Sequence, residues 1–112
     1  MQSVISKPGS NIYIPLSVKN ASGQLVNADS TPTVTDTQLN GADAAFAPTV
    51  AQAQDDTPAN ITGQYVITLD GSTLADGDEV FIYVSAVVGG TTTTTTKLVS
   101  IIDLASGGPS IE

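Results

Sequence analysis

The sequence contains no cysteine, histidine, arginine or tryptophan. The side chains that most often serve as nucleophiles, general bases, zinc ligands and anion clamps are therefore missing, and no catalytic triad can be assembled. Carboxylates remain, and they cluster at Asp55 and Asp56 and again at Asp76, Asp78 and Glu79. Five aromatic residues are too few to build the cleft in which a glycosidase holds such a pair. We therefore expect no enzyme, no catalytic residue and no cofactor.

Positive charge is scarce, because three lysines stand against eleven acidic residues and the net charge is −8. Nucleic-acid binding depends on cationic side chains that neutralise phosphates, and anionic lipid surfaces attract the same side chains. The chain also lacks an apolar run of about 18 residues, which would span a bilayer, and a secretory signal at its start. We expect no nucleic-acid partner and no membrane. The initial Met suggests a freestanding product made in the cytoplasm.

The apolar content is mainly aliphatic, and much of it is β-branched. Apolar residues make up 40% of the 112 residues, and threonine occurs fifteen times. Branched side chains lose rotamer freedom in helices but pack well on pleated sheets. A chain of this length forms one domain and buries a core without metals or disulfides. We predict an all-β fold, a β-sandwich of about seven antiparallel strands.

The first clear strand follows the N-terminal segment. Ile12, Ile14, Leu16 and Val18 alternate with polar or small residues, which is the period of a half-buried strand. Pro15 lies within this strand and cannot donate to a ladder. The pattern predicts a strand at the edge of its sheet, or one with a bulge at the proline.

The next segments combine turn residues with shorter strands. Gly23 lies in the turn NASGQ, where it can adopt a positive φ, and a threonine-rich strand is expected around residues 32–38. Residues 40–63 are rich in alanine, but Pro48 interrupts any helix there. We predict a strand near residues 46–50, followed by a long loop.

Alternation returns in the second half of the chain. Tyr65, Ile67 and Leu69 share one face of a strand, and Leu74 is expected to plug the end of the core. The strand 79–88 presents an uninterrupted apolar face, which predicts a central position in its sheet. That face consists of Val80, Ile82, Val84, Ala86 and Val88.

The glycines at residues 89–90 predict a hairpin, and its register has two alternatives. A two-residue turn places Lys97 opposite Ile82 on the buried face. A three-residue loop places Leu98 opposite Val80 and moves Lys97 to the outside. Because a one-residue slip inverts every side chain, and a buried lysine is costly, we predict the three-residue loop.

The six consecutive threonines at residues 91–96 form the start of the following strand. In the predicted register Thr92, Thr94 and Thr96 face inward, and Thr91, Thr93 and Thr95 face outward. Such a run serves as a strand that stays soluble on its exposed face. The alternative is a flat polar surface that pairs with the edge of a neighbouring subunit.

The sequence predicts neither a calcium site nor an isopeptide link. Asp76, Asp78 and Glu79 with Asp70 crowd oxygen ligands into a short segment, as a Ca²⁺ site requires, but their spacing matches no EF-hand loop. Acids in a turn are usually solvated, so no metal is predicted. A self-forming isopeptide link would need a buried lysine, whereas the alternation places Lys19 outside.

The two ends are polar and punctuated by Gly and Pro. We predict an N-terminal arm at residues 1–10, a sandwich domain at residues 11–102 and a C-terminal arm at residues 103–112. Such arms order against a neighbour in an assembly.

Two segments carry a resemblance to a family. VKNASGQLVNADSTPTV and GQYVITLDGSTLADGDEVFIYVSAVVGG resemble bacterial immunoglobulin-like domains, in which a strand and turn precede a G-x-Y-x-v-x-L strand, a G-D loop and a final hairpin. Gly63, Tyr65 and Leu69 match this pattern, and the resemblance covers residues 10–102. Similar domains occur in structural proteins of tailed bacteriophages, as decoration proteins on heads and as modules of tails and fibres.

The resemblance implies a capsid decoration (cement) protein. Such a protein is made in the host cytoplasm, binds the major capsid protein on the outer surface of the virion head, and forms a homo-oligomer, expected to be a trimer. One alternative is an immunoglobulin-like module of a phage tail, neck or fibre that contacts host glycan, for which Tyr13, Phe81 and Tyr83 are the candidate aromatics. Another is a stalk domain of a bacterial surface adhesin.

Overall fold

The computed structural model describes residues 2–6 and 9–102, and every regular element among them is a β-strand. None of these residues forms a helix, so the described chain holds no helix that could cross a membrane. The strands are β1 (Gln2–Ser6), β2 (Ile12–Ser17), β3 (Thr33–Leu39), β4 (Ala42–Asp43), β5 (Thr49–Gln54), β6 (Asn60–Leu69), β7 (Glu79–Val88) and β8 (Thr91–Ile101).

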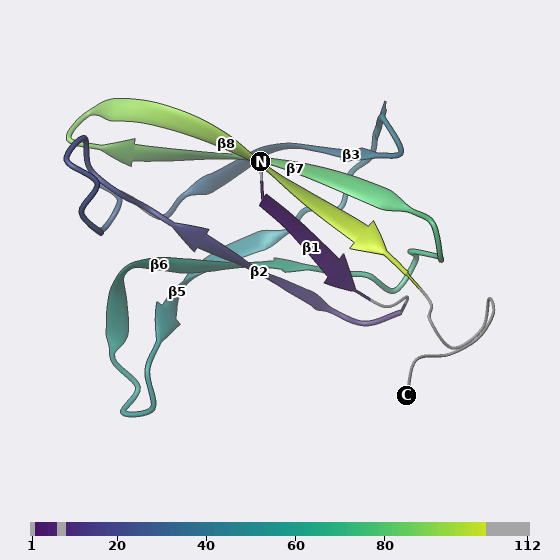
Figure 1. The fold of residues 1–112 in the computed structure, drawn as a ribbon, viewed down its shortest axis with the longest axis horizontal. Helices are drawn as coiled ribbons and strands as arrows, with labels where there is room; N and C mark the ends of the chain where they lie inside the picture. The colour runs from purple at the N-terminus through teal and green to yellow at the C-terminus, as the bar shows by residue number, and fades with distance from the viewer. Residues whose placement is uncertain (1, 7–8, 103–112) are drawn as a thin grey trace.

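The strands form two facing sheets, as Figure 1 shows. One sheet has the order β1-β8-β7-β3-β4 and the other has the order β2-β6-β5. Set beside immunoglobulin domains, β2, β6 and β5 take the places of strands B, E and D, and β8, β7 and β3 take those of G, F and C. The predicted all-β sandwich is confirmed. Residues 2–6 and 9–102 form eight strands rather than about seven, and one neighbouring pair among them, β1 and β8, is parallel.

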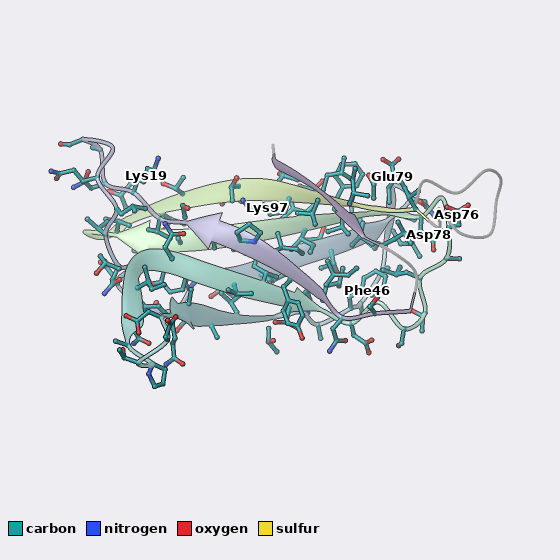
Figure 2. The ribbon with its side chains drawn as sticks, turned by 60° about the horizontal axis from the view of Figure 1, so that its bottom comes forward. Lys19, Phe46, Asp76, Asp78, Glu79 and Lys97 are labelled. Atoms are coloured by element: carbon teal, nitrogen blue, oxygen red, sulfur yellow. The ribbon has the colours of Figure 1, made fainter. Side chains whose placement is uncertain are left out.

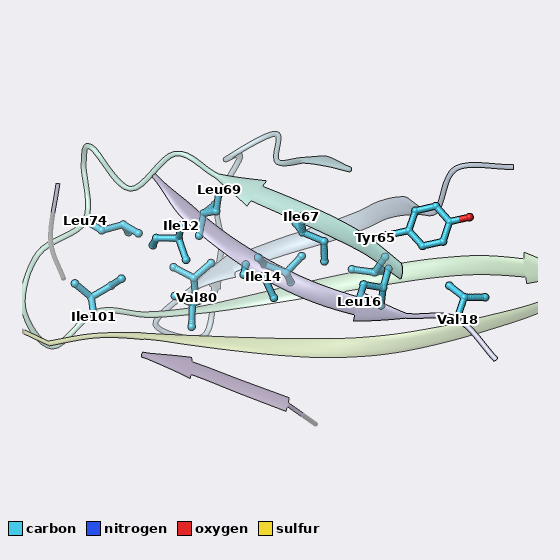
Figure 3. Close-up of a cluster of buried hydrophobic side chains, with 13 residues drawn as sticks. Ile12, Ile14, Leu16, Val18, Tyr65, Ile67, Leu69, Leu74, Val80 and Ile101 are labelled. Carbon is cyan, nitrogen blue, oxygen red and sulfur yellow. The ribbon is translucent and has the colours of Figure 1, made fainter. Parts of the chain in front are cut away.

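The core lies between the two sheets and is almost entirely aliphatic. Alternate side chains of β2 and β6 face those of β7 and β8, as Ile14, Ile67 and Val80 do in Figure 3. The predicted inward faces of β2 and β6 are confirmed, and Leu74 closes one end of the core. The buried apolar residues are Ile12, Ile14, Leu16, Val18, Tyr65, Ile67, Leu69, Leu74, Val80, Ile82, Val84, Val99 and Ile101.

Strand β2 lies at the edge of the three-stranded sheet, as Pro15 predicts. The Val18 N–H donates to the Gly63 carbonyl at 2.8 Å, so every second residue back from Val18 bonds to β6 and the missing N–H of Pro15 falls on the open edge. Gly23 has a φ of +82°, as its turn requires. The predicted central position of β7 is also confirmed, because β7 lies between β8 and β3.

The segment 40–63 departs from the prediction. The expected strand near residues 46–50 begins at Thr49 instead and continues as β5 to Gln54. The loop that follows is therefore short, and Asp55 closes it by accepting hydrogen bonds from the N–H groups of Thr57 and Ala59 at 2.9 and 2.8 Å. The strand begins after Pro48 because a proline in its interior would remove a ladder hydrogen bond.

The predicted register of the β7–β8 hairpin is wrong. Gly89 and Gly90 alone form the turn, with φ values of +56° and +80°, and Lys97 lies opposite Ile82. Two successive positive φ angles are what the favoured two-residue turn needs. The three-residue loop would have turned Val99 and Ile101 out of the core, whereas these residues are 0% and 1% exposed. Burying both of them outweighs keeping Lys97 outside.

Because the register differs by one residue, the two faces of the threonine run are exchanged. Thr91, Thr93 and Thr95 lie on the core side of β8, and Thr92, Thr94 and Thr96 lie on the outer side.

The two predicted arms have different outcomes. Residues 2–6, assigned to the N-terminal arm, form β1 and pair in parallel with residues 97–101 of β8, rather than projecting from the sandwich. The C-terminal arm, residues 103–112, lies outside the described residues.

Candidate interaction site

The loop between β2 and β3 joins both sheets at the hairpin end of the sandwich. On one side, the Asn27 side-chain oxygen accepts hydrogen bonds from the N–H of Gly63 and from the Gln52 amide, at 2.9 and 2.7 Å. The Ala28 N–H donates to the Tyr65 hydroxyl at 3.0 Å. These contacts fix the loop on the three-stranded sheet.

On the other side, the same loop holds the tip of the β7–β8 hairpin. The Asp29 carboxylate accepts hydrogen bonds from the N–H groups of Gly89 and Gly90, at 3.0 and 2.9 Å. The Asp29 N–H donates to the Val87 carbonyl at 2.7 Å. Hydrogen bonds to a carboxylate are roughly twice as strong as neutral ones, so the tip is well anchored.

A groove opens between the hairpin and the end of β2. Its volume is about 360 Å³, and the inner side of the hairpin and residues 16–21 form its walls. The groove exists because the inward side chains become smaller and more polar toward the tip, where Ala86 and threonines replace isoleucine and valine. The hairpin side chains that line it are Val84, Ala86, Val88, Thr91, Thr93 and Thr95.

One wall of the groove is a strand whose outer edge is open. In the part of the chain that the structure describes, β1 covers β8 along residues 97–101, whereas residues 91–96 pair on one side, with β7. In Figure 1 this part of β8 forms the outer border of its sheet. The edge contains no charge and no proline.

Lys97 follows Thr95 along the inner face of β8, and Figure 2 shows it between the sheets. Its side chain is 5% exposed, and this burial lowers its pKa. Lys19 is exposed and lines the groove itself. The predicted outside position of Lys19 is confirmed, and that of Lys97 is not.

Asp76, Asp78 and Glu79 lie at the opposite end of the molecule from Lys19 in Figure 2. Asp78 accepts hydrogen bonds from the Ala75 N–H at 2.9 Å and from the Asn40 amide at 3.1 Å, and these two contacts, the first above all, lower its pKa. Asp70 accepts from the Ser72 N–H at 3.0 Å, which lowers its pKa in the same way. These acids cap turns. Within residues 2–6 and 9–102 no three acidic side chains gather as a metal site.

A second hollow of about 570 Å³ lies beside β3 and β4. Residues 34–37, 43–45 and 47–48 line it, with Asp36 and Asp43 as the titratable groups. The buried Thr37 hydroxyl donates to the Ala44 carbonyl and so is satisfied within the fold.

The three candidate glycan-contacting aromatics are not brought together. Tyr13 is 64% exposed and lies on the outer face of β2. Phe81 and Tyr83 are half-buried and lie on the outer face of β7, in the other sheet. The outer faces of the two sheets point in opposite directions, so these residues form no common stacking platform.

Comparison with known proteins adds little to this geometry. No family model and no curated protein matches the chain. A solved structure titled "Solution Structure of Amebosin" aligns at a TM-score of 0.49 and 19% sequence identity, over 88% of this chain and 87% of that chain. A likeness at this level carries no argument about function.

Proposed function

We propose that this protein is a structural component of a phage virion, a decoration protein that binds the major capsid protein on the outer surface of the head. The observation that carries the proposal is the contrast between the two ends of the sandwich. The hairpin end has an uncharged open strand edge beside a groove lined by small and apolar side chains, whereas Asp70 and Asp78 at the other end accept hydrogen bonds from turn N–H groups. Such a surface suits docking to another protein rather than chemistry.

The physical effect of a decoration protein follows from mass action. A protein that binds the assembled shell, and not its separated subunits, stabilises the shell by an amount set by its concentration and affinity. At a free concentration of 100 times Kd, this contribution is about 2.7 kcal/mol for each site. A docked copy bridges neighbouring capsid subunits. The trimer predicted on the shell is an arrangement imposed by a local symmetry axis of the shell, and it does not require a trimer in solution.

A second candidate is an immunoglobulin-like module of a phage tail, neck or fibre that contacts glycan. The exposure of Tyr13 favours it, because an exposed aromatic ring stacks on sugar faces. The separation of Tyr13 from Phe81 and Tyr83 weighs against it, since one ring makes a small platform. A stalk domain of a surface adhesin remains the third alternative.

The test uses empty shells assembled from the major capsid protein of the same genome. We expect the purified protein to co-sediment with the shells, to saturate at a fixed ratio to capsid subunits, and to raise the temperature at which the shells come apart. The Tyr13→Ala variant should bind shells as the wild type does. Absence of co-sedimentation at saturating protein would contradict the proposal, and glycan binding that Tyr13→Ala abolishes would favour the tail or fibre module.

A further inference from the structure

Most strand edges of this sandwich carry a feature that discourages pairing with another chain. β4 is two residues long, and β1 is followed directly by Lys7 and Pro8 in the sequence. β2 contains Pro15, and the ladder of β5 changes register after Gln52. Short strands, prolines, lysines and bulges are the usual protections of an edge. The edge of β8 along residues 91–96 has none of them.

The hydrogen-bonding groups of this edge follow from the hairpin register. Val88 and Thr91 flank a two-residue turn, and such a pair exchanges its N–H and C=O groups across the hairpin. Bonding then alternates along the strand, so the odd-numbered threonines bond to β7. The residues whose backbone groups point to the open side are Thr92, Thr94 and Thr96.

We propose that two copies of this chain pair through residues 91–96 of β8, in antiparallel orientation around a two-fold axis, to form one sheet that runs through both sandwiches. Residues directly opposite one another share a face of the sheet, so the axis passes through Thr93 or Thr94. β1 already occupies the position beside Lys97. An axis through Thr94 would place residue 91 of the second copy beside Lys97, where it would overlap β1. An axis through Thr93 pairs residues 91–95 of the two copies and avoids this overlap.

The distribution of charge makes this edge a place where a second copy can approach without meeting an acidic side chain. The chain has a net charge of −8, so most of its surface repels another copy. No carboxylate lies in residues 91–96 or in the lining of the groove, where Lys19 is the charged residue. Asp29 holds the tip from the β2–β3 loop. Two acidic copies therefore meet at this edge without acid facing acid.

The groove gives the paired edge an apolar contact as well. Thr91, Thr93 and Thr95 form its wall on the open side, next to Ala86 and Val88. A strand added beside β8 continues this wall, and the inward threonine methyl groups of the second copy extend over the groove. Threonine pairs that lie opposite one another on neighbouring strands stabilise a paired edge relative to alanine.

The paired edge is small, and a weak dimer is the consequence. Stable interfaces bury about 1,200–2,000 Å² in total, and five residues from each copy bury less than that. We expect a Kd between about 10 µM and about 1 mM. A trimer is not expected from this edge alone, because a three-fold ring needs two different complementary surfaces, whereas a self-complementary edge closes with two copies.

The first experiment measures mass by sedimentation equilibrium from about 5 µM to about 1 mM, the span of the expected Kd. The wild type and Thr94→Val should dimerise, because valine keeps the backbone donor and the strand propensity. Thr94→Pro should remain monomeric, since proline removes a donor that points to the open edge and spares the pairing with β7. Both variants lose the contact between the Ser85 and Thr94 hydroxyls, at 3.1 Å, so this loss cannot explain a difference between them.

The second experiment locates the axis and does not depend on the folding of a proline variant. The chain has no cysteine, so Thr93→Cys introduces a single thiol, which lies opposite its own copy and within disulfide reach. Mild oxidation should cross-link Thr93→Cys at least tenfold faster than Thr62→Cys, which carries an exposed thiol on β6.

Four results would overturn the inference. They are a monomer throughout the concentration range, a dimer that persists in Thr94→Pro, a trimer, and equal cross-linking of the two cysteine variants. A monomer in which the amides of residues 92–96 are protected at every dilution would show that the edge is covered from within the same chain. Shell binding is measured separately, so the inference can fail while the proposed function holds, and the reverse.

Discussion

At the scale of the residue, Lys97 combines a cationic group with a position on the core face of β8. Its side chain is 5% exposed, and burial lowers its pKa from the ordinary value of 10.5. The folded state then binds this proton less tightly than the unfolded state does. The cost is fully present below the folded pKa, and it shrinks as the pH rises from the folded pKa toward the unfolded value.

Replacing Lys97 with methionine should therefore stabilise the fold near pH 7. We expect Lys97→Met to raise the free energy of unfolding by about 1 kcal/mol, because methionine keeps the apolar stem and removes the charge. The difference in the free energy of unfolding between Lys97→Met and the wild type should narrow as the pH rises from the lowered folded pKa toward 10.5. Chemical denaturation at several pH values measures both effects, with Lys19→Met at an exposed site as the matched control. A loss of stability in Lys97→Met would show that the contacts of the ammonium group outweigh its burial.

At the scale of the element, the start of β6 packs closely against the loop that follows β2. Gly63 has a φ of +73°, and a Cβ at this position would lie 2.9 Å from the Val18 carbonyl and 3.0 Å from the Val26 N–H. Gly23 has a similar φ of +82° but nothing within 4 Å. Substitutions at the two glycines therefore distinguish the cost of a side chain at positive φ from the cost of close packing.

Alanine at these two positions should have unequal effects. Gly23→Ala should cost about 1 kcal/mol, the strain of a left-handed residue. Gly63→Ala should cost about 3 kcal/mol or more, because backbone atoms must also move apart. Thermal and urea unfolding of both variants gives the comparison. Equal losses of stability in the two variants would show that the backbone around residue 63 moves apart without an energetic penalty.

The sequence pattern correctly predicted those strands whose inward face does not depend on the register with a partner strand. The alternation in β2 and β6 gave the core positions directly, and Pro15 gave the edge. The hairpin register failed because Lys97 was weighed against Leu98, while Val99 and Ile101, two and four residues further on, decided the face. β1 was missed because its pairing with β8 joins opposite ends of the chain, and no local pattern reports such a contact.

Only part of the candidate site could be predicted from the sequence. The threonine run suggested an edge for pairing, but its exposure depends on where β1 stops beside β8. The groove depends on how the end of β2 lies over the hairpin. Both are consequences of packing between distant segments, so single-sequence periodicity contains no signal for them.

At the scale of the whole molecule, charge sets the conditions under which copies meet. Eleven acids and three lysines give each copy a long-range negative field, while the proposed contact is uncharged. Repulsion between copies then opposes an association that its local contacts favour. Salt shortens the range of that repulsion, from about 30 Å at 0.01 M to about 10 Å at 0.1 M.

Self-association should therefore strengthen when salt is added. Between about 0.01 M and about 0.1 M NaCl, we expect the dimer Kd to fall several-fold, with no further large change above that range. Sedimentation of the wild type and Thr94→Val should show the same trend, and Thr94→Pro should stay monomeric at both concentrations. An affinity that falls with salt would indicate that opposite charges hold the copies together.

The parallel pairing of β1 with β8 also determines how the domain bears a mechanical load. A pull on the chain before Gln2 and after Ile101 acts along these two strands in opposite directions, because both run the same way. The force is then shared among the hydrogen bonds of the five-residue ladder, which must slide and break together instead of opening one after another. Tension applied through the two ends must therefore break the β1–β8 ladder in shear before it can separate the strands of the core.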